Sequence, residues 1–387
     1  MQLNKIGSRV LAVLCLAGQA WLSSCDDHEP TRMKFVKMPT EQQASWQASL
    51  RMLDQALQES PNNPALHYQI AQIYYQQGND TAALGYIRNS LKFDSVNCRY
   101  VLLASAIYLQ MDKPQEASRW MKSLKASQCV AKADYYLGKT LLAAELAEPS
   151  LGSWVDTLQQ LLASGDANLA WAQGLLALQQ GDSTKALSLL KTAYDKNPTA
   201  SITNYLCMAA LRANNPTLAL AYLNPWLKWA PQHATLLLRK AVCMQALQQP
   251  DSAMIFYEKV VRLHPHRVGL WLTLSELAYQ RENYKAAERY SRELLTHQPQ
   301  SAEAKYQLAL ALVKQAKMEE AFKVAKEAHL LKPDWDKAKQ LAERLEVDKN
   351  PPPVQQNYTY QAPVNAAEKQ ATESPVKQQT TTEEKKE

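Results

Sequence analysis

Glycine and phenylalanine are scarce in this sequence, with ten and four residues respectively among 387. No segment alternates apolar and polar residues in the way a half-buried β-strand would. Alanine, leucine and glutamine dominate instead, and this composition predicts an all-α protein. The length suffices for two average domains or for one extended repeat array.

Motifs of catalysis are also lacking. The sequence contains no HExxH zinc motif, no GxSxG nucleophile elbow, no P-loop and no dinucleotide-binding glycine fingerprint. Aspartate and glutamate are scattered, and we expect them on the outer faces of helices. We therefore predict that the chain is not an enzyme and holds no cofactor.

Seven histidines are the remaining candidates for a metal site. His28 lies near the N-terminus and His67 in a predicted helix. The others lie at or near the ends of predicted helices, at His233, His264, His266, His297 and His329. Most lie one repeat apart, which is too far for a shared metal, and helix C-termini favour cationic side chains. We predict structural histidines and no metal, with His264 and His266 as the only close pair.

Positive charge is not concentrated. The formal net charge is +6, and it falls to +4 when Lys5 and Arg9 are removed with the segment described below. Both signs are spread along the chain, unlike the single basic face of a nucleic-acid binder. Nucleic acid is therefore not an expected partner.

Six cysteines are present and no two form a CxxC pair, which argues against a zinc ribbon or a thioredoxin-like site. Cys98 and Cys129 flank one predicted helical hairpin and could form a disulfide in an oxidising compartment, or could remain free. Cys207 and Cys243 lie on apolar helices, where buried free thiols are expected.

The N-terminal segment has the parts of a secretory signal. Lys5 and Arg9 precede the apolar run VLAVLCLA, which is too short to span a bilayer, and small residues lead to Cys25. Leu22-Ser23-Ser24-Cys25 resembles the bacterial lipobox, in which the cysteine carries the lipid. This predicts a signal peptide at 1–24, a lipid on Cys25 and a tether at 25–40. The alternative is an ordinary signal cleaved after Ala20, which would release a soluble protein.

The acidic stretch after Cys25 bears on location. Asp26-Asp27-His28-Glu29 resembles the surface-export signal of Bacteroidota lipoproteins, whereas in enteric bacteria an aspartate after the cysteine resembles an inner-membrane retention signal. We expect a lipid-anchored protein of a Gram-negative cell envelope, with the outer membrane favoured over the inner membrane. The sequence does not distinguish the periplasmic leaflet from the surface leaflet.

The middle of the sequence repeats with a period near 34 residues. Prolines recur at Pro198, Pro231, Pro265, Pro299 and Pro333, spaced 33, 34, 34 and 34 apart. Alanines recur in the same register at Ala186, Ala219, Ala253, Ala287 and Ala321. A small residue lets the two helices of a unit approach closely, and the proline ends one unit before the next.

Four windows carry this pattern best, starting at 64, 167, 268 and 302. The window VGLWLTLSELAYQRENYKAAERYSRELLTHQPQ has Trp271, Leu274, Ala287 and Pro299 in phase, and resembles tetratricopeptide repeats (TPRs) in period and signature residues. The resemblance covers about 64–335 and implies a right-handed superhelical solenoid of about eight helix–turn–helix repeats. The units start near 64, 98, 131, 167, 200, 234, 268 and 302.

Other segments complete the predicted organisation. The unit at 131–166 departs most, because Pro149 and Gly152 interrupt it, and a bend there is expected. An amphipathic helix within 41–63 precedes the solenoid at 64–347, whose last helix caps the array with its charged face toward water. Residues 348–387 are rich in Pro, Gln, Thr, Lys and Glu without apolar periodicity, which predicts a disordered tail.

The resemblance also implies a binding groove lined by the first helices of the units. The fifth residue of a unit commonly faces this groove, here Tyr68, Leu102, Tyr135, Trp171, Asn204, Leu238, Leu272 and Tyr306. Their groove neighbours include Gln72, Tyr75, Lys139, Leu175, Arg212, Tyr279 and Lys314. The alternative, which we weigh equally for each aromatic ring, is that it packs between adjacent first helices instead of facing the groove.

Aromatic residues with a few cations suit an extended or helical peptide. We expect a non-catalytic, lipid-anchored scaffold that binds another envelope protein or peptide, within a secretion, gliding or assembly machinery. The alternative is a ligand- or peptidoglycan-associated module, which would have a deep pocket at the irregular unit 131–166.

Overall fold

A computed structural model describes the backbone of residues 43–349 and the side chains of residues 47–346. It contains eighteen α-helices and one 3-10 turn, and no strand occurs within the described residues. The predicted signal peptide, the tether and Cys25 lie outside these residues, as does the predicted tail from residue 350 onward.

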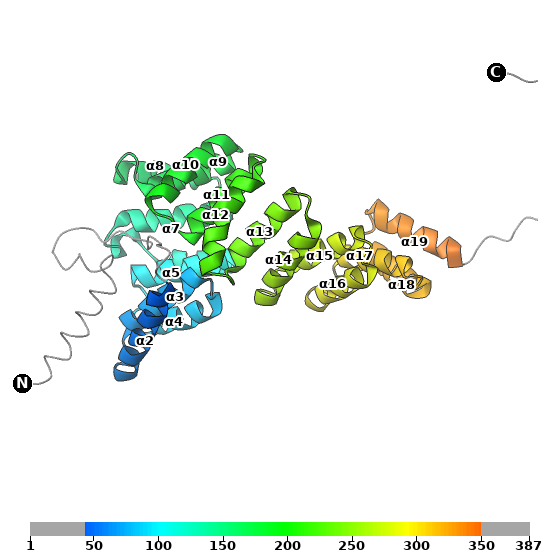
Figure 1. Cartoon of the computed structure of the whole chain (residues 1–387), viewed down its shortest axis with the longest axis horizontal. Coiled ribbons are helices and arrows are strands. Elements are labelled where there is room, and N and C mark those ends of the chain that lie inside the picture. The colour runs from blue at the N-terminus through cyan, green and yellow to red at the C-terminus, as the bar shows by residue number, and fades with distance from the viewer. Residues whose placement is uncertain (1–42, 350–387) are drawn as a thin grey trace, which may run out of the picture.

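Sixteen of the helices form eight consecutive hairpins (Figure 1). Their first helices are α3 (Pro64–Gln77), α5 (Cys98–Gln110), α7 (Lys132–Glu145), α9 (Ala167–Gln179), α11 (Ala200–Arg212), α13 (Ala234–Ala246), α15 (Val268–Gln280) and α17 (Ala302–Lys314). Their second helices are α4 (Asp80–Phe93), α6 (Pro114–Ser123), α8 (Leu151–Leu161), α10 (Ser183–Lys196), α12 (Pro216–Trp229), α14 (Pro250–Leu263), α16 (Tyr284–His297) and α18 (Met318–Leu331). Every predicted unit start coincides with a helix start to within one residue.

Two further helices flank the array, α2 (Gln43–Glu59) before it and α19 (Asp336–Lys349) after it. Leu341 and Leu345 of α19 are buried against the last hairpin, as expected of a capping helix. The short turn η1 (Ala126–Gln128) separates the second and third hairpins, and the disulfide between Cys98 and Cys129 is formed beside it.

Local sequence sets the helix ends. Side chains of Asn63, Asn79 and Asn283 accept hydrogen bonds from backbone N–H groups of the first turns of α3, α4 and α16. Such caps satisfy donors that the helix itself leaves unpaired. Each hairpin turn contains one residue in the left-handed region, with φ between 52° and 82°. These residues are Gly78, Asp112, Ala147, Gly181, Asn214, Gln248, Glu282 and Ala316.

The alanine row explains why the two helices of a hairpin pack so closely. Seven of the eight second helices carry a fully buried repeat alanine, at Ala83, Ala117, Ala186, Ala219, Ala253, Ala287 and Ala321, and α8 of the irregular unit has none. The hydrophobic core is divided into clusters along the array, each shared by neighbouring hairpins. This is the arrangement of a solenoid, in which each unit contacts mainly its neighbours.

Candidate functional site

The array does not stay open along its whole length. In Figure 1, α3 and α5 lie beside the lower ends of α12 and α13, whereas α15 to α19 extend away to the right. Turns 77–80 and 110–113 of the first two hairpins contact loops 230–233 and 264–267, which lead into α13 and α15. We call these four segments the closure, because they join the N-terminal hairpins to later ones as a ring.

Hydrogen bonds across the closure join residues more than 120 positions apart. Thr235 donates its hydroxyl to the carbonyl oxygen of Gln110 at 3.4 Å, and Arg267 Nη2 donates to the same oxygen at 3.0 Å. His266 Nε2 lies 3.0 Å from the carbonyl oxygen of Met111. Loop 264–267 and the first turn of α13 are therefore held to the backbone of the second hairpin turn.

Asp80, the first residue of α4, is the acidic centre of the closure. Its Oδ2 lies 3.5 Å from His264 Nε2, and Gln110 Nε2 donates to its Oδ1 at 2.5 Å. The residue is only 2% exposed. Burial raises the pKa of Asp80 to about 7, although the Gln110 hydrogen bond and the charge of Arg267 oppose the rise.

Two buried histidines accompany this carboxyl group. Burial lowers the pKa of His264 to about 4, and the positive charge of Arg267 acts in the same direction. Burial likewise lowers the pKa of His233 to about 4, and neither of its ring nitrogens has a hydrogen-bond partner in another described residue. Both imidazoles are therefore neutral at pH 7.

Inside the ring, first helices bond to one another. The hydroxyl oxygens of Tyr75 on α3 and Ser201 on α11 are 3.1 Å apart. Tyr205 of α11 donates to the carboxylate of Glu145 on α7, and the rings of Tyr205 and Trp171 lie 6.4 Å apart. These contacts occupy the inner face of the N-terminal hairpins.

Arg239 of α13 adds a cation to this interior. Its Nε donates to Asn204 Oδ1 at 2.6 Å. Burial lowers the pKa of Arg239, while the charge of Glu145 opposes that effect. The inner face thus combines a partly buried cation with polar side chains that bond to one another, and its acid, Glu145, is exposed.

The fifteen residues predicted to line the groove fall into three groups. Those buried in the structure are Tyr75, Leu102, Trp171, Leu175 and Asn204. Those partly buried are Tyr68, Gln72, Tyr135, Lys139, Leu238, Leu272, Tyr279 and Tyr306. Arg212 and Lys314 are exposed. Because a buried side chain cannot touch a partner while the ring is closed, the first group packs the interior in this state.

The C-terminal hairpins keep their first helices outside the ring. Tyr279 of α15, Tyr306 of α17 and Lys314 of α17 belong to this part (Figure 1). The ring of Tyr306 lies 4.7 Å from that of Trp335, and Lys332 Nζ lies 5.4 Å from the Trp335 ring centroid. The C-terminal hairpins thus present partly exposed aromatic side chains beside cations, in a part of the array that the closure does not cover.

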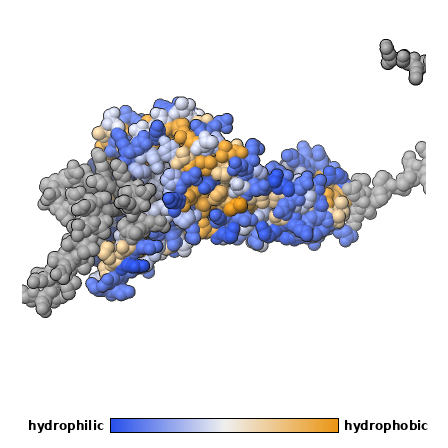
Figure 2. Space-filling view, in the orientation of Figure 1, coloured by the Kyte–Doolittle hydropathy of each residue, from blue (hydrophilic) through white to orange (hydrophobic). Residues whose placement is uncertain are grey.

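Hydrophobic residues gather on one face of the molecule. Figure 2 shows them over its middle, where α11 to α14 lie, while the C-terminal hairpins present a mostly hydrophilic face in this view. On α14, Ile255 is 54% exposed, and Phe256 is partly buried under Lys240 and Lys259, whose Nζ atoms lie 4.9 and 5.3 Å from its ring.

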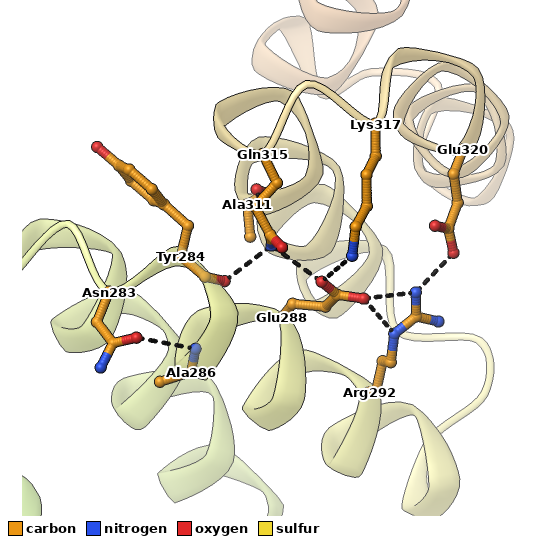
Figure 3. A network of polar contacts seen from close by, with 9 residues as sticks. All are labelled: Asn283, Tyr284, Ala286, Glu288, Arg292, Ala311, Gln315, Lys317 and Glu320. Carbon is orange, nitrogen blue, oxygen red and sulfur yellow. Dashed lines mark hydrogen bonds and ion pairs between the residues drawn. The ribbon is translucent and has the colours of Figure 1, made fainter.

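Charged contacts join the C-terminal hairpins to each other. In Figure 3, the Glu288 carboxylate of α16 receives hydrogen bonds from Arg292, from Gln315 and from Lys317, which lies at the start of α18. Arg292 also pairs with Glu320 of α18 at 2.6 Å. Burial raises the pKa of Glu288, but the hydrogen bonds outweigh this effect and lower it to about 2.

A hollow of about 290 Å³ lies at the closure, lined by Gln77, Asp80, Trp229, Gln232 and His264 among others. No lining residue comes from the irregular unit 131–166, where a deep pocket was expected of a ligand-binding module. Among the described residues, no three histidine, cysteine or acidic side chains are grouped to hold a metal. No helix in this part of the chain is long and apolar enough to cross a membrane.

One expectation about acidic residues is wrong. Asp80 and Asp134 are 2% and 7% exposed, whereas aspartates were expected on outer faces. Asp80 is buried because the first hairpin turn meets a loop nearly two hundred residues later, and no local pattern signals that contact. The sequence did place His264 and His266 as a close pair, and their rings lie 5.5 Å apart.

Two family profiles match parts of the chain. One, described as anaphase-promoting complex, cyclosome, subunit 3, matches residues 42–124. The other, described as tetratricopeptide repeat, matches residues 131–201 and 272–345. No curated protein matches the sequence.

Solved structures resemble the fold at low sequence identity. A chain of the APC/C hetero-tetramer Cut9–Hcn1 is 15% identical with a TM-score of 0.59; the match covers 79% of this chain and 60% of that one. MamA from Desulfovibrio magneticus RS-1 is 23% identical over 39% of this chain and 85% of its own, with a TM-score of 0.36. Yeast Tom70 is 14% identical over 88% of this chain and 81% of its own, with a TM-score of 0.41.

The Cut9–Hcn1 likeness extends the resemblance from the matched segments to most of the described array. The repeat period, the buried alanine row and the tetratricopeptide-repeat matches in the middle and at the C-terminal end of the array agree with it. The described residues therefore form an all-α solenoid of tetratricopeptide repeats.

Proposed function

We propose that this chain is a non-catalytic scaffold that binds a protein or peptide partner on the first helices of its C-terminal hairpins. The observation that carries the proposal is the contrast between its two halves. Five predicted groove residues of the N-terminal hairpins, Trp171 and Asn204 among them, are buried, whereas none of those in the C-terminal hairpins is: Tyr279 and Tyr306 are partly exposed and Lys314 is exposed. Aromatic anchors beside a cation are residue types that dominate binding energy at interfaces.

The chemistry of this surface favours a peptide with apolar side chains and some negative charge. Tyr279 and Tyr306 offer apolar rings with a polar tip, and Lys314 at the end of α17 offers an exposed ammonium group. A helix or an extended segment could place apolar anchors against successive hairpins. The family profile that matches residues 42–124 and the similar Cut9–Hcn1 chain both belong to the anaphase-promoting complex, which supports an assembly role for this chain by analogy.

The proposal extends to location. The stretch Leu22-Ser23-Ser24-Cys25 supports a lipid on Cys25, and hence a membrane-anchored protein of a Gram-negative envelope, with the outer membrane preferred. The acidic residues that follow support a Bacteroidota lipoprotein. The partner would then be another envelope protein, in a secretion, gliding or assembly machinery.

Site-specific photo-crosslinking in cells tests the binding surface. A photoreactive benzoylphenylalanine replaces Tyr306, and a control variant carries it at Lys326, an exposed residue on the second helix α18. We expect a discrete crosslinked partner from position 306 and none from position 326. Adducts from neither position, or the same adducts from both, would overturn the proposed surface.

Fractionation tests the anchor separately. Cys25→Ala removes the only thiol of the lipobox-like stretch, so the protein should move from the membrane fraction to the soluble fraction. Ser24→Ala keeps a small residue before the cysteine and should leave the protein in the membrane fraction. If Cys25→Ala leaves the fractionation unchanged, the lipid anchor is rejected while the crosslinking result stands.

A further inference from the structure

The closure joins parts of the chain that a repeat solenoid would otherwise keep apart. Each hairpin of such an array contacts mainly its neighbours. Here the second hairpin turn contacts the loop before the seventh hairpin through His266 and Arg267, and the first turn of α13 through Thr235; the first hairpin turn approaches His233 at Gly78. The contact is made by turns and loops, so it can separate without breaking any hairpin.

The closest approach in the closure occurs at Gly78. A Cβ atom built on Gly78 would lie 2.6 Å from Cα of His233, which is a backbone atom that cannot rotate away. Gly78 also has φ of 74°, as does Gly181 at 82° in the fourth hairpin, but nothing lies within 4 Å of a Cβ atom at Gly181. An alanine would therefore be strained by the left-handed backbone at either position, but only at Gly78 would its Cβ atom also meet the closure.

Charged and titratable groups face one another from every element of the closure. The first hairpin turn contributes Asp80, and the second contributes Asp112 and Lys113. The loop before α13 contributes His233, and the loop before α15 contributes His264, His266 and Arg267. The charge of Glu145 on α7 also acts on Arg267. The ring nitrogens of His233 are buried without partners in other residues. A proton added to His233 would create a buried charge beside Arg267 and His264, which the closed state cannot solvate.

We propose that the closure is a latch: it holds the N-terminal hairpins shut over their own inner residues, and acid opens it through His233. Opening would separate the hydroxyl groups of Tyr75 on α3 and Ser201 on α11 and expose the inner face around them. The latch itself is a property of the isolated chain and does not depend on a partner. Only its role, which is to control access of a partner to the groove of the N-terminal hairpins, rests on the proposed function.

The pH dependence follows from the three buried groups. Burial in the closed state lowers the pKa of His233 from 6.5 to about 4, so relative to an open state that solvates the ring its stabilisation of the closed state is complete above pH 6.5 and is lost toward pH 4. Burial also lowers the pKa of His264 to about 4, whereas it raises that of Asp80 from 3.8 to about 7, so the Asp80 contribution is lost as pH rises to 7. The effects of His264 and Asp80 oppose each other between pH 4 and 6.5, which leaves His233 to set the direction in that range.

Dipolar electron paramagnetic resonance on the isolated full chain measures opening directly. Spin labels are placed on Thr81→Cys and Gln232→Cys, two exposed positions that line the same hollow, while the native Cys207 and Cys243 are buried. At pH 7.5 we expect one short interspin distance. Between pH 6.5 and 4 a longer distance should gain population, by about tenfold in the equilibrium constant per pH unit for one proton.

Three variants in the labelled background separate the latch from simple unfolding, with helicity followed by circular dichroism. Gly78→Ala should populate the long distance at pH 7.5, whereas Gly181→Ala, which has the same strain but no closure contact, should keep the short one. His233→Phe cannot take up a proton and should stay closed at pH 4.5. A short distance in folded Gly78→Ala, or equal acid opening in His233→Phe, would overturn the proposal whatever the crosslinking in cells shows.

Discussion

Trp171 of α9 and Tyr306 of α17 hold the same place in their repeats but differ in surroundings. Trp171 is 1% exposed, and its ring lies 6.4 Å from that of Tyr205 inside the closed ring. Tyr306 is partly exposed and packs on Trp335. The repeat position alone therefore does not decide whether a residue is core or surface. The position of its hairpin in the array decides it.

Alanine substitution should separate these two residues. Trp171→Ala should lower the free energy of unfolding by about 3–5 kcal/mol, because it leaves a large cavity. Tyr306→Ala removes only partly buried area and should cost about 1–2 kcal/mol while weakening crosslinking to the partner. Urea unfolding followed by circular dichroism measures both values. Equal costs would mean that Tyr306 is a core residue and not a binding residue.

Glu282 shows a second effect at the residue scale. It has φ of 58° in the seventh hairpin turn, where Gly78 and Gly181 supply glycine in the corresponding turns. A side chain in the left-handed region costs roughly 1–2 kcal/mol, partly offset by the lower unfolded-state entropy of a non-glycine residue. Glu282→Gly should therefore raise the thermal midpoint, with a gain of about 1 kcal/mol. Glu282→Ala keeps the Cβ atom and should show no such gain.

At the scale of elements, the contacts of Glu288 join α16 to the hairpin that follows. Glu288→Gln should lower the free energy of unfolding by about 1–2 kcal/mol at pH 7, since it weakens several charge-assisted hydrogen bonds at once. The pKa of Glu288 is depressed from 4.5 to about 2, so this stabilisation is present above pH 4.5 and is lost as pH falls toward 2.

A matched variant makes the Glu288 experiment decisive. Glu320→Gln removes a single pair with Arg292 from a side chain that is 43% exposed, and should cost less than about 0.5 kcal/mol. Urea unfolding at pH 7 and at pH 3 should show the gap between native protein and Glu288→Gln shrinking at the lower pH. A gap that stays constant would show that the Glu288 charge does not stabilise the array.

The sequence allowed the elements to be predicted because their signals are local. Alanine and proline recur every 33 or 34 residues, and each repeat start depends on residues within its own hairpin. The closure was not predictable in this way, because it depends on the sum of small rotations between successive hairpins. Asp80 and His264 are brought together only by this cumulative rotation. For Trp171 the sequence left packing between helices and exposure in the groove as equal alternatives, and the structure shows that it is buried.

For the whole molecule, closure should divide stability between the two halves. The N-terminal hairpins contact their sequence neighbours and also the far side of the ring, through residues such as Arg267 and Tyr75. The hairpins after α15 have sequence neighbours alone, apart from their cap. Local opening follows the number of contacts that must break, so the C-terminal hairpins should open at lower free energy.

Hydrogen exchange followed by mass spectrometry measures this division. At pH 7.5, backbone amides of α16 to α18 should exchange at least about tenfold faster than those of α9 to α11, which corresponds to about 1.4 kcal/mol. Gly78→Ala should raise exchange in α3 and α5 toward the C-terminal rates, whereas Gly181→Ala should not affect those helices. Uniform exchange along the native array would mean that the closure adds no stability, and that the N-terminal hairpins are stabilised only by contacts within and between neighbouring hairpins.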